Sequence, residues 1–233
     1  MIGIIVQLAL SWLIIWLFEK GNFSFLGLRP TKKRLRDFII FLLVTALCSS
    51  SGFLLRMWLA KEQWELNPLV NARLVFEGIW WNIKSVMFEE LIFRGVLFYI
   101  LIKKLGAIKA IIISAVAFGI YHWFSFEVLG NMQQMTIVFL ITGIAGLLYA
   151  YAYAKTFSLY IPIAIHFGWN FTRGFVFSEG NIGPGIFIPV KSQPLVTVSW
   201  FVYFCIAWLP ILSMLLINFF LLRQKKQALP PNQ

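Results

Sequence analysis

The sequence predicts an all-α polytopic membrane protein, a helical bundle of about seven transmembrane helices. Of its 233 residues, 60% are hydrophobic and only 12% are charged, whereas soluble domains are about 45–50% apolar and about 25% charged. The mean hydropathy is +0.82. The apolar residues also gather into separate runs, each close to the roughly 20 residues that a spanning helix needs.

Seven apolar runs are expected to be spanning helices, because only a helix satisfies its own backbone hydrogen bonds in lipid. The first run has no basic region before it, so we expect a span and not a cleaved signal peptide. Together the runs predict one integral-membrane domain over residues 1–233. The expected spans are residues 1–18, 37–60, 79–101, 106–124, 134–154, 157–176 and 195–222.

The segments between the spans differ in charge, and this predicts the orientation. Most of the 20 lysines and arginines lie in segments 19–36 and 102–105, at Lys109 and Lys155, and after residue 222. Such segments are cytoplasmic by the positive-inside rule. We therefore expect the N-terminus outside and the C-terminus in the cytoplasm, in a bacterial cytoplasmic membrane. Segment 19–36 is expected to be a loop, and the tail "RQKKQALPPNQ" is expected to be disordered.

The formal net charge of +11 does not indicate a nucleic-acid partner. The basic residues flank apolar runs, where they set topology and contact anionic lipid headgroups. The two cysteines, Cys48 and Cys205, lie inside apolar runs and are expected to be small buried hydrophobic residues.

Three charged residues interrupt the third expected span, in the stretch "KSVMFEELIFRGVLF". Each of Glu89, Glu90 and Arg94 would cost about 2.5–3.5 kcal/mol at the bilayer centre if left unpaired. Glu90 and Arg94 are one turn apart and would pair. Glu89 points about 100° away on the helix and must face another group.

Polar residues in two other spans are candidates for that group. "FGIYH" places His122 late in the fourth span, and "HFGWN" places His166 and Asn170 one turn apart in the sixth. A single intramembrane histidine is often only hydrogen-bonded to a neighbouring helix. Two histidines, an amide and paired carboxylates together predict a shared polar site.

These residues are suited to the attack of water on an amide carbonyl. Burial favours a protonated carboxyl and a nearby arginine favours an ionised one, so two adjacent glutamates can take different roles. A histidine and an asparagine one turn apart can stabilise an oxyanion. Zinc held by the histidines and glutamates is the chemical alternative, but the HExxH pattern is absent. We expect no metal and no other cofactor.

The three motifs "EELIFR", "FGIYH" and "HFGWN" resemble, in order, those of the CPBP family of intramembrane glutamic endopeptidases, which includes CAAX prenyl endopeptidases and bacteriocin-immunity proteins. The resemblance covers residues 79–176 and implies a core of four motif-bearing spans around a polar cavity, working without a required metal. It implies Glu89 as the general base, Glu90 as its support and Arg94 as the residue that holds Glu90. It further implies that His122 orients the water, and that His166 and Asn170 form the oxyanion hole.

The predicted function is thus an intramembrane endopeptidase acting on a peptide or membrane-protein substrate that reaches the site from the bilayer. That substrate would be a lipidated, prenylated-type tail or a transmembrane segment. A non-catalytic scaffold or immunity protein that binds a partner remains the main alternative. A proton or ion pathway is the third. The sequence does not give the oligomeric state.

Overall fold

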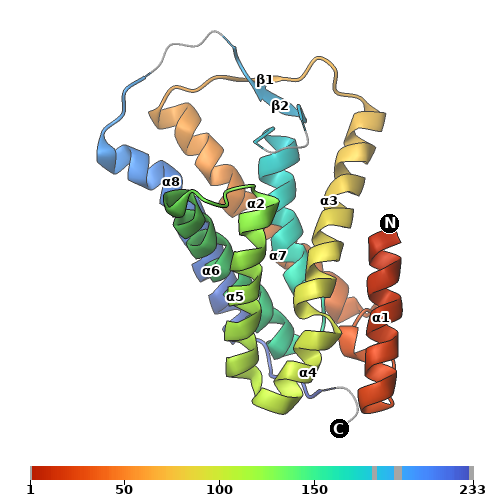
Figure 1. The fold of residues 1–233 in the computed structure, drawn as a ribbon. Helices are drawn as coiled ribbons and strands as arrows, with labels where there is room; N and C mark the ends of the chain where they lie inside the picture. The colour runs from red at the N-terminus through yellow and green to blue at the C-terminus, as the bar shows by residue number, and fades with distance from the viewer. Residues whose placement is uncertain (1, 180–182, 192–195, 231–233) are drawn as a thin grey trace. The chain divides into compact units, whose positions relative to one another are not determined.

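The computed structural model describes residues 2–179, 183–191 and 196–230, and most of these residues are helical (Figure 1). Two short strands, β1 (Trp64–Leu66) and β2 (Phe187–Pro189), pair antiparallel. The prediction of an all-α membrane protein is confirmed. The helical elements are α1 (Ile2–Glu19), η1 (Phe23–Leu26), α2 (Lys32–Leu59), α3 (Ala72–Arg94), α4 (Val96–Leu105), α5 (Ala107–Ser125), α6 (Met132–Thr156), α7 (Tyr160–Phe171), η2 (Thr172–Val176) and α8 (Trp200–Arg223).

Within the described ranges, five helices are long and apolar enough to cross a membrane: α1, α2, α5, α6 and α8. They correspond to five of the seven predicted spans, with ends that differ by a few residues; residue 195, the predicted start of the last span, lies outside the described residues. The predicted span 157–176 is helical but not uniform, because the 12 residues of α7 are followed by the π-helical turn η2.

The predicted span 79–101 is wrong as one continuous helix. α3 ends at Arg94 and α4 begins at Val96, with Gly95 between them at a non-helical ψ of −145°. A Cβ atom at residue 95 would clash with the carbonyl group of Leu91, so only glycine fits this break. As a result, Arg94 is the last residue of α3 and does not lie in the middle of a span.

The described chain forms two compact units. Unit 1 contains residues 1–38, 86–163 and 219–233, and unit 2 contains residues 39–85 and 164–218. Each unit is assembled from distant parts of the sequence, and α2, α3, α7 and α8 each contribute residues to both. This division does not test the predicted single integral-membrane domain, which stays a prediction.

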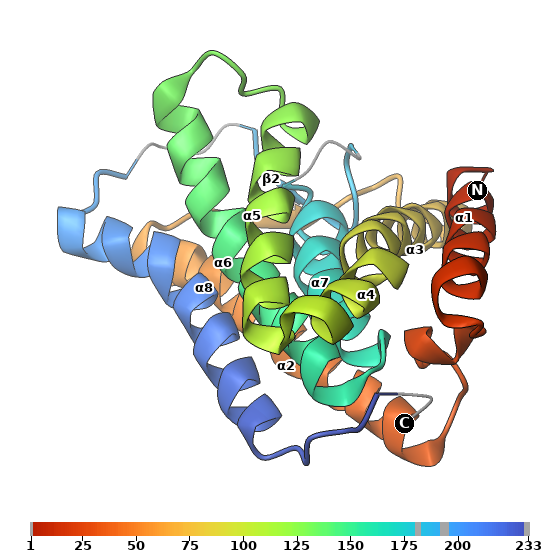
Figure 2. The same ribbon diagram turned by 60° about the horizontal axis from the view of Figure 1, so that its bottom comes forward.

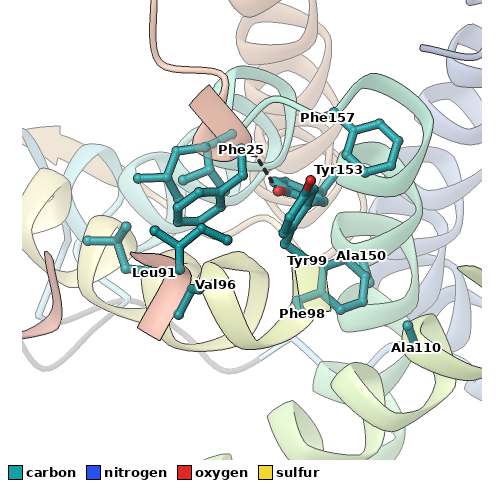
Figure 3. Close-up of a cluster of buried hydrophobic side chains, with 12 residues drawn as sticks. Phe25, Leu91, Val96, Phe98, Tyr99, Ala110, Ala150, Tyr153 and Phe157 are labelled. Carbon is teal, nitrogen blue, oxygen red and sulfur yellow. Dashed lines mark hydrogen bonds between the residues drawn. The ribbon is translucent and has the colours of Figure 1, made fainter. Parts of the chain in front are cut away.

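Unit 1 has an aromatic-rich hydrophobic core (Figure 3). Phe25 of η1 packs on Tyr99 of α4, with 5.5 Å between ring centroids, and Phe98 packs on Tyr153 of α6 at the same separation. The Tyr153 hydroxyl donates a 2.6 Å hydrogen bond to the Phe25 carbonyl oxygen. Since a buried tyrosine hydroxyl needs a polar partner, this bond fixes η1 against α6.

The basic segment after α1 is more ordered than predicted. It contains the 3₁₀ turn η1, which ends at Gly27 in the left-handed region at φ +60°. A Cβ atom on Gly27 would overlap the Phe157 carbonyl oxygen and Ser158. α2 then begins at Lys32, five residues before the predicted start.

The prediction of a disordered tail is wrong for the described residues after α8. Lys225 pairs with Asp37 at 2.6 Å, and the Ala228 amide donates to the Lys155 carbonyl oxygen at 3.0 Å. The Gln227 side chain also donates to the Ala154 carbonyl oxygen at 2.8 Å. These bonds attach the tail to the start of α2 and to the C-terminal end of α6. Residues 231–233 lie outside the described residues.

In unit 2, α7 packs closely on α2 at Gly168. A Cβ atom on Gly168 would come within 2.9 Å of the Leu42 carbonyl oxygen and 3.2 Å of the Thr45 Cβ, so glycine allows the two helices to pack closely. The strands β1 and β2 belong to the same unit.

Candidate active site

The last turn of α3 carries a buried ion pair. Arg94 Nη1 donates to Glu90 Oε1 at 3.1 Å, and both side chains are fully buried. Residues four apart on a helix lie on one face, so the predicted pairing follows from the spacing and is present. Removing either partner would leave an uncompensated buried charge, which is strongly destabilising.

Aromatic side chains enclose the guanidinium of Arg94. Its Cζ atom lies 4.3 Å from the ring centre of Phe118 in α5 and 5.2 Å from that of Tyr149 in α6. Its Nη2 atom donates to the Gly146 carbonyl oxygen in α6 at 3.2 Å. With Phe93 at 5.7 Å as a third ring, the cation is held by one carboxylate, one carbonyl oxygen and three aromatic rings, and such cation–π contacts gain strength away from water.

Gly146 makes this arrangement possible because it lets α6 approach α5, and the two helices run side by side in Figures 1 and 2. A Cβ atom at residue 146 would lie 3.1 Å from Phe118 Cδ1, 3.3 Å from Ala115 Cα and 3.3 Å from Arg94 Nη2. At Gly143, one turn earlier, the only near atom is the Ala115 carbonyl oxygen, at 3.7 Å. The position beside Arg94 is thus packed more tightly than the position one turn earlier on α6.

Glu89 faces His122 of α5. Glu89 Oε2 lies 3.8 Å from His122 Nε2, and both residues are nearly buried, with exposures of 9% and 7%. His122 Nδ1 lies 2.8 Å from the Phe118 carbonyl oxygen. Since a carbonyl oxygen only accepts, Nδ1 carries the hydrogen, and Nε2 is the acceptor in the neutral ring. The second nitrogen of the imidazole is therefore directed at the Glu89 carboxyl group.

Three aromatic rings hold the His122 imidazole. The ring centre of Phe118 lies 4.4 Å away, that of Tyr121 5.3 Å and that of Phe126 5.5 Å. All three belong to α5 or follow it directly. Together with the Nδ1 bond, these contacts fix the ring orientation, as preorganised sites require.

Of the six predicted site residues, the structure brings four together in unit 1: Glu89, Glu90, Arg94 and His122. The other two, His166 and Asn170, lie one turn apart on α7 in unit 2, where His166 is buried and Asn170 is half-buried. The approach of His166 and Asn170 to Glu89 therefore stays a prediction.

Two residues that contact Arg94 were not predicted as part of the site. Gly146 and Tyr149 supply a carbonyl oxygen and a ring face to Arg94, but neither was assigned a role in the site. Their spacing of three places both on one face of α6. The sequence signal at this face is a stripe of small residues at four-residue spacing, Gly146, Ala150 and Ala154, which predicts close helix packing and nothing more.

Among the described residues, no group of three or more histidine, cysteine, aspartate or glutamate side chains has an arrangement that would hold a metal ion. The four residues in unit 1 supply two carboxyl groups, an imidazole and a guanidinium in one polar cluster. The chemistry available to such a cluster is proton transfer and charge stabilisation.

A model of a protein family described as type II CAAX prenyl endopeptidase Rce1-like matches residues 38–172. The match covers more than half of the chain and includes all six predicted site residues. Comparison with curated proteins gave no match, and neither did comparison with solved structures.

Proposed function

Since this chain belongs to the type II CAAX prenyl endopeptidase Rce1-like family, we propose that it is an intramembrane endopeptidase that uses Glu89 to activate water. The observation that carries the proposal is the position of Glu89 Oε2, 3.8 Å from His122 Nε2. This separation is too long for a direct hydrogen bond. Polar groups at this separation can be bridged by a water molecule. A water that contacts both atoms would be oriented by them.

In the proposed reaction, the water oxygen attacks the carbonyl carbon of the scissile peptide bond. Glu89 takes a proton from the water as the C–O bond forms, and the carbonyl π electrons move to the oxygen. The tetrahedral intermediate then collapses, the C–N bond breaks, and Glu89 gives its proton to the leaving nitrogen. General acid–base catalysis of this kind contributes about 10²–10⁴-fold to the rate.

The other residues would stabilise this step. The Glu90–Arg94 pair fixes the end of α3 and so the position of Glu89, one residue before Glu90. We propose that His166 and Asn170 donate hydrogen bonds to the developing oxyanion, where each well-placed donor is worth about 10²–10³-fold in kcat. This part of the proposal rests on the resemblance and on the one-turn spacing of the two residues on α7.

The proposed substrate is a peptide that carries a prenyl-type lipid or a transmembrane segment, because the family is one of CAAX prenyl endopeptidases and His122 lies on α5, a helix long and apolar enough to cross a membrane. The chain is an integral membrane protein, with five helices that suit a bilayer. We propose that it resides in a bacterial cytoplasmic membrane with its C-terminus in the cytoplasm, which the distribution of lysine and arginine supports. Reporter fusions at the C-terminus that are active only on one side of the membrane would test this orientation.

The activity itself is tested with purified protein in detergent micelles and a library of farnesylated, geranylgeranylated and unmodified peptides, with cleavage read by mass spectrometry. We expect cleavage of a subset, undiminished when a zinc chelator is added. If the chelator abolishes cleavage, the reaction depends on zinc and the proposed mechanism is wrong. Binding of a peptide without any cleavage, unchanged in Glu89→Gln, would favour the non-catalytic scaffold.

A further inference from the structure

A polar pocket lies in unit 1, apart from the candidate active site. None of Glu89, Glu90, Arg94 or His122 lines it. It has a volume of about 310 Å³, within the range typical of small-molecule sites. Its walls come from the start of α2, the α6–α7 junction and the tail after α8. Four of the lining residues are cations: Lys33, Arg34, Lys225 and Lys226.

The charge in this pocket is mostly uncompensated. Asp37 is the carboxylate in the lining, and Lys225 pairs with it at 2.6 Å. Lys33 and Lys226 are exposed and form no ion pair with any residue in the described part of the chain. A pocket of this charge attracts an anion, and both lysines are positioned to contact one.

The pocket is held in shape by hydrogen bonds from its own walls. Ser158 Oγ donates to the Gly27 carbonyl oxygen at 3.0 Å, and the Tyr160 hydroxyl donates to that of Leu28 at 3.2 Å. Arg34 Nη1 donates to the Arg29 carbonyl oxygen at 2.8 Å, which holds this guanidinium at the rim. Preorganised walls lower the ordering cost of binding.

An apolar hollow of about 680 Å³ adjoins the basic pocket and shares Arg34, Thr156 and Ala228 with it. Its lining includes three apolar side chains that remain exposed, Phe23 at 39%, Leu28 at 37% and Leu229 at 76%. A cationic pocket next to an apolar hollow matches a molecule with a negatively charged head and a hydrocarbon chain.

We infer that this composite site binds the phosphate headgroup of an anionic phospholipid in the basic pocket and part of an acyl chain in the hollow. Basic pockets at the ends of transmembrane helices bind anionic lipid headgroups, and the cytoplasmic leaflet is the richer in such lipids. The lining residues belong to the segments that the charge distribution predicts to face that leaflet. The site would fix the tail, α2 and the α6–α7 junction to one lipid.

The inference is tested by native mass spectrometry of the full-length protein titrated with phosphatidylglycerol or phosphatidylcholine of equal chain length. We expect one phosphatidylglycerol to bind at least about tenfold more tightly than phosphatidylcholine, since each lysine near an anionic surface contributes appreciably. The double variant Lys33→Gln/Lys226→Gln should lose about tenfold in phosphatidylglycerol affinity. The matched control Lys32→Gln/Lys109→Gln removes two exposed lysines that do not line the pocket, and should stay within about twofold of wild type.

Competition with glycerol phosphate and with inorganic phosphate distinguishes a lipid from a soluble phosphate. We expect neither to displace phosphatidylglycerol at equal concentration, because neither fills the apolar hollow. Displacement by either one would overturn the lipid assignment in favour of a soluble phosphate site. Equal affinity for the two lipids, or an equal loss of phosphatidylglycerol affinity in both double variants, would show that binding follows general surface charge and not this pocket. Either result would overturn the inference.

Discussion

Arg94, the last residue of α3, donates through Nη2 to the carbonyl oxygen of Gly146 in α6 at 3.2 Å. The same guanidinium pairs with Glu90 at 3.1 Å. One buried cation thus connects the carboxylate next to the proposed base with the helix that packs on α5. The stability of this connection determines how rigidly Glu89 is presented to His122.

The Glu90–Arg94 pair is expected to behave as a unit. Glu90→Gln and Arg94→Gln should each lower the free energy of unfolding by about 3–5 kcal/mol, because each variant removes one charge of a buried ion pair and leaves the other charge in place. The double variant should lose less than the sum of the two, with a coupling of about 0.5–3 kcal/mol. Denaturant unfolding of all four proteins in one detergent measures this, and strict additivity would contradict the pairing.

Gly146→Ala should destabilise the protein by about 1–3 kcal/mol, as overpacking of a tight contact does. It should also lower kcat, because the added methyl group meets Arg94 Nη2 at 3.3 Å. Gly143→Ala, one turn away with its nearest neighbour at 3.7 Å, is the matched control and should be neutral or slightly stabilising. Equal melting temperatures for the two variants would show that residue 146 has more room than the structure indicates.

The two nitrogens of His122 are expected to have separate roles. Asparagine at residue 122 keeps a donor near the position of Nδ1 for the Phe118 carbonyl oxygen but has no atom at Nε2, whereas glutamine has an amide near Nε2. We expect His122→Asn to lower kcat by about 100-fold and His122→Gln by about tenfold, within the range of positioned proton-transfer groups. Both should melt close to wild type. The opposite order of activities would assign the catalytic contact to Nδ1.

Gly27 and Gly106 both have positive φ, at +60° and +81°, but only Gly27 lacks room for a side chain. Gly106→Ala should lose about 1–3 kcal/mol of stability, because a φ of 81° with a ψ of 160° is a backbone conformation that glycine alone adopts readily. Gly27→Ala adds overlap with the Phe157 carbonyl oxygen and should lose about 1–3 kcal/mol more. Thermal unfolding of the two variants separates backbone strain from overlap, and equal losses would contradict the close packing of η1.

The helical character and most span positions could be predicted from the sequence, because the hydropathy of a 20-residue stretch is an average over many side chains and does not depend on any one contact. The break at Gly95 could not, since it depends on the closeness of the Leu91 carbonyl group, which one glycine in an apolar run does not reveal. The Glu90–Arg94 pair was predictable because both residues lie on one helix. The Gly146 carbonyl contact was not, because a backbone oxygen has no signature in the sequence and its partner is 52 residues away.

The tail after α8 shows a similar limit. Its composition of lysine, glutamine and proline is typical of disordered segments, yet Lys225, Gln227 and Ala228 each bond to unit 1. Those partners are two backbone carbonyls and one aspartate from distant segments. Local composition cannot anticipate them.

The most direct measurement of the central claim is the cleavage rate of Glu89→Gln relative to wild type, with Glu77→Gln as the control on the same helix. Glu77 is exposed and pairs with Arg73 at 2.8 Å, so its replacement makes the same chemical change away from the proposed site. If Glu89 is the general base, Glu89→Gln should lose at least about 100-fold in kcat while Glu77→Gln keeps the wild-type rate and both variants melt normally. A folded Glu89→Gln protein that cleaves at the wild-type rate would contradict the account.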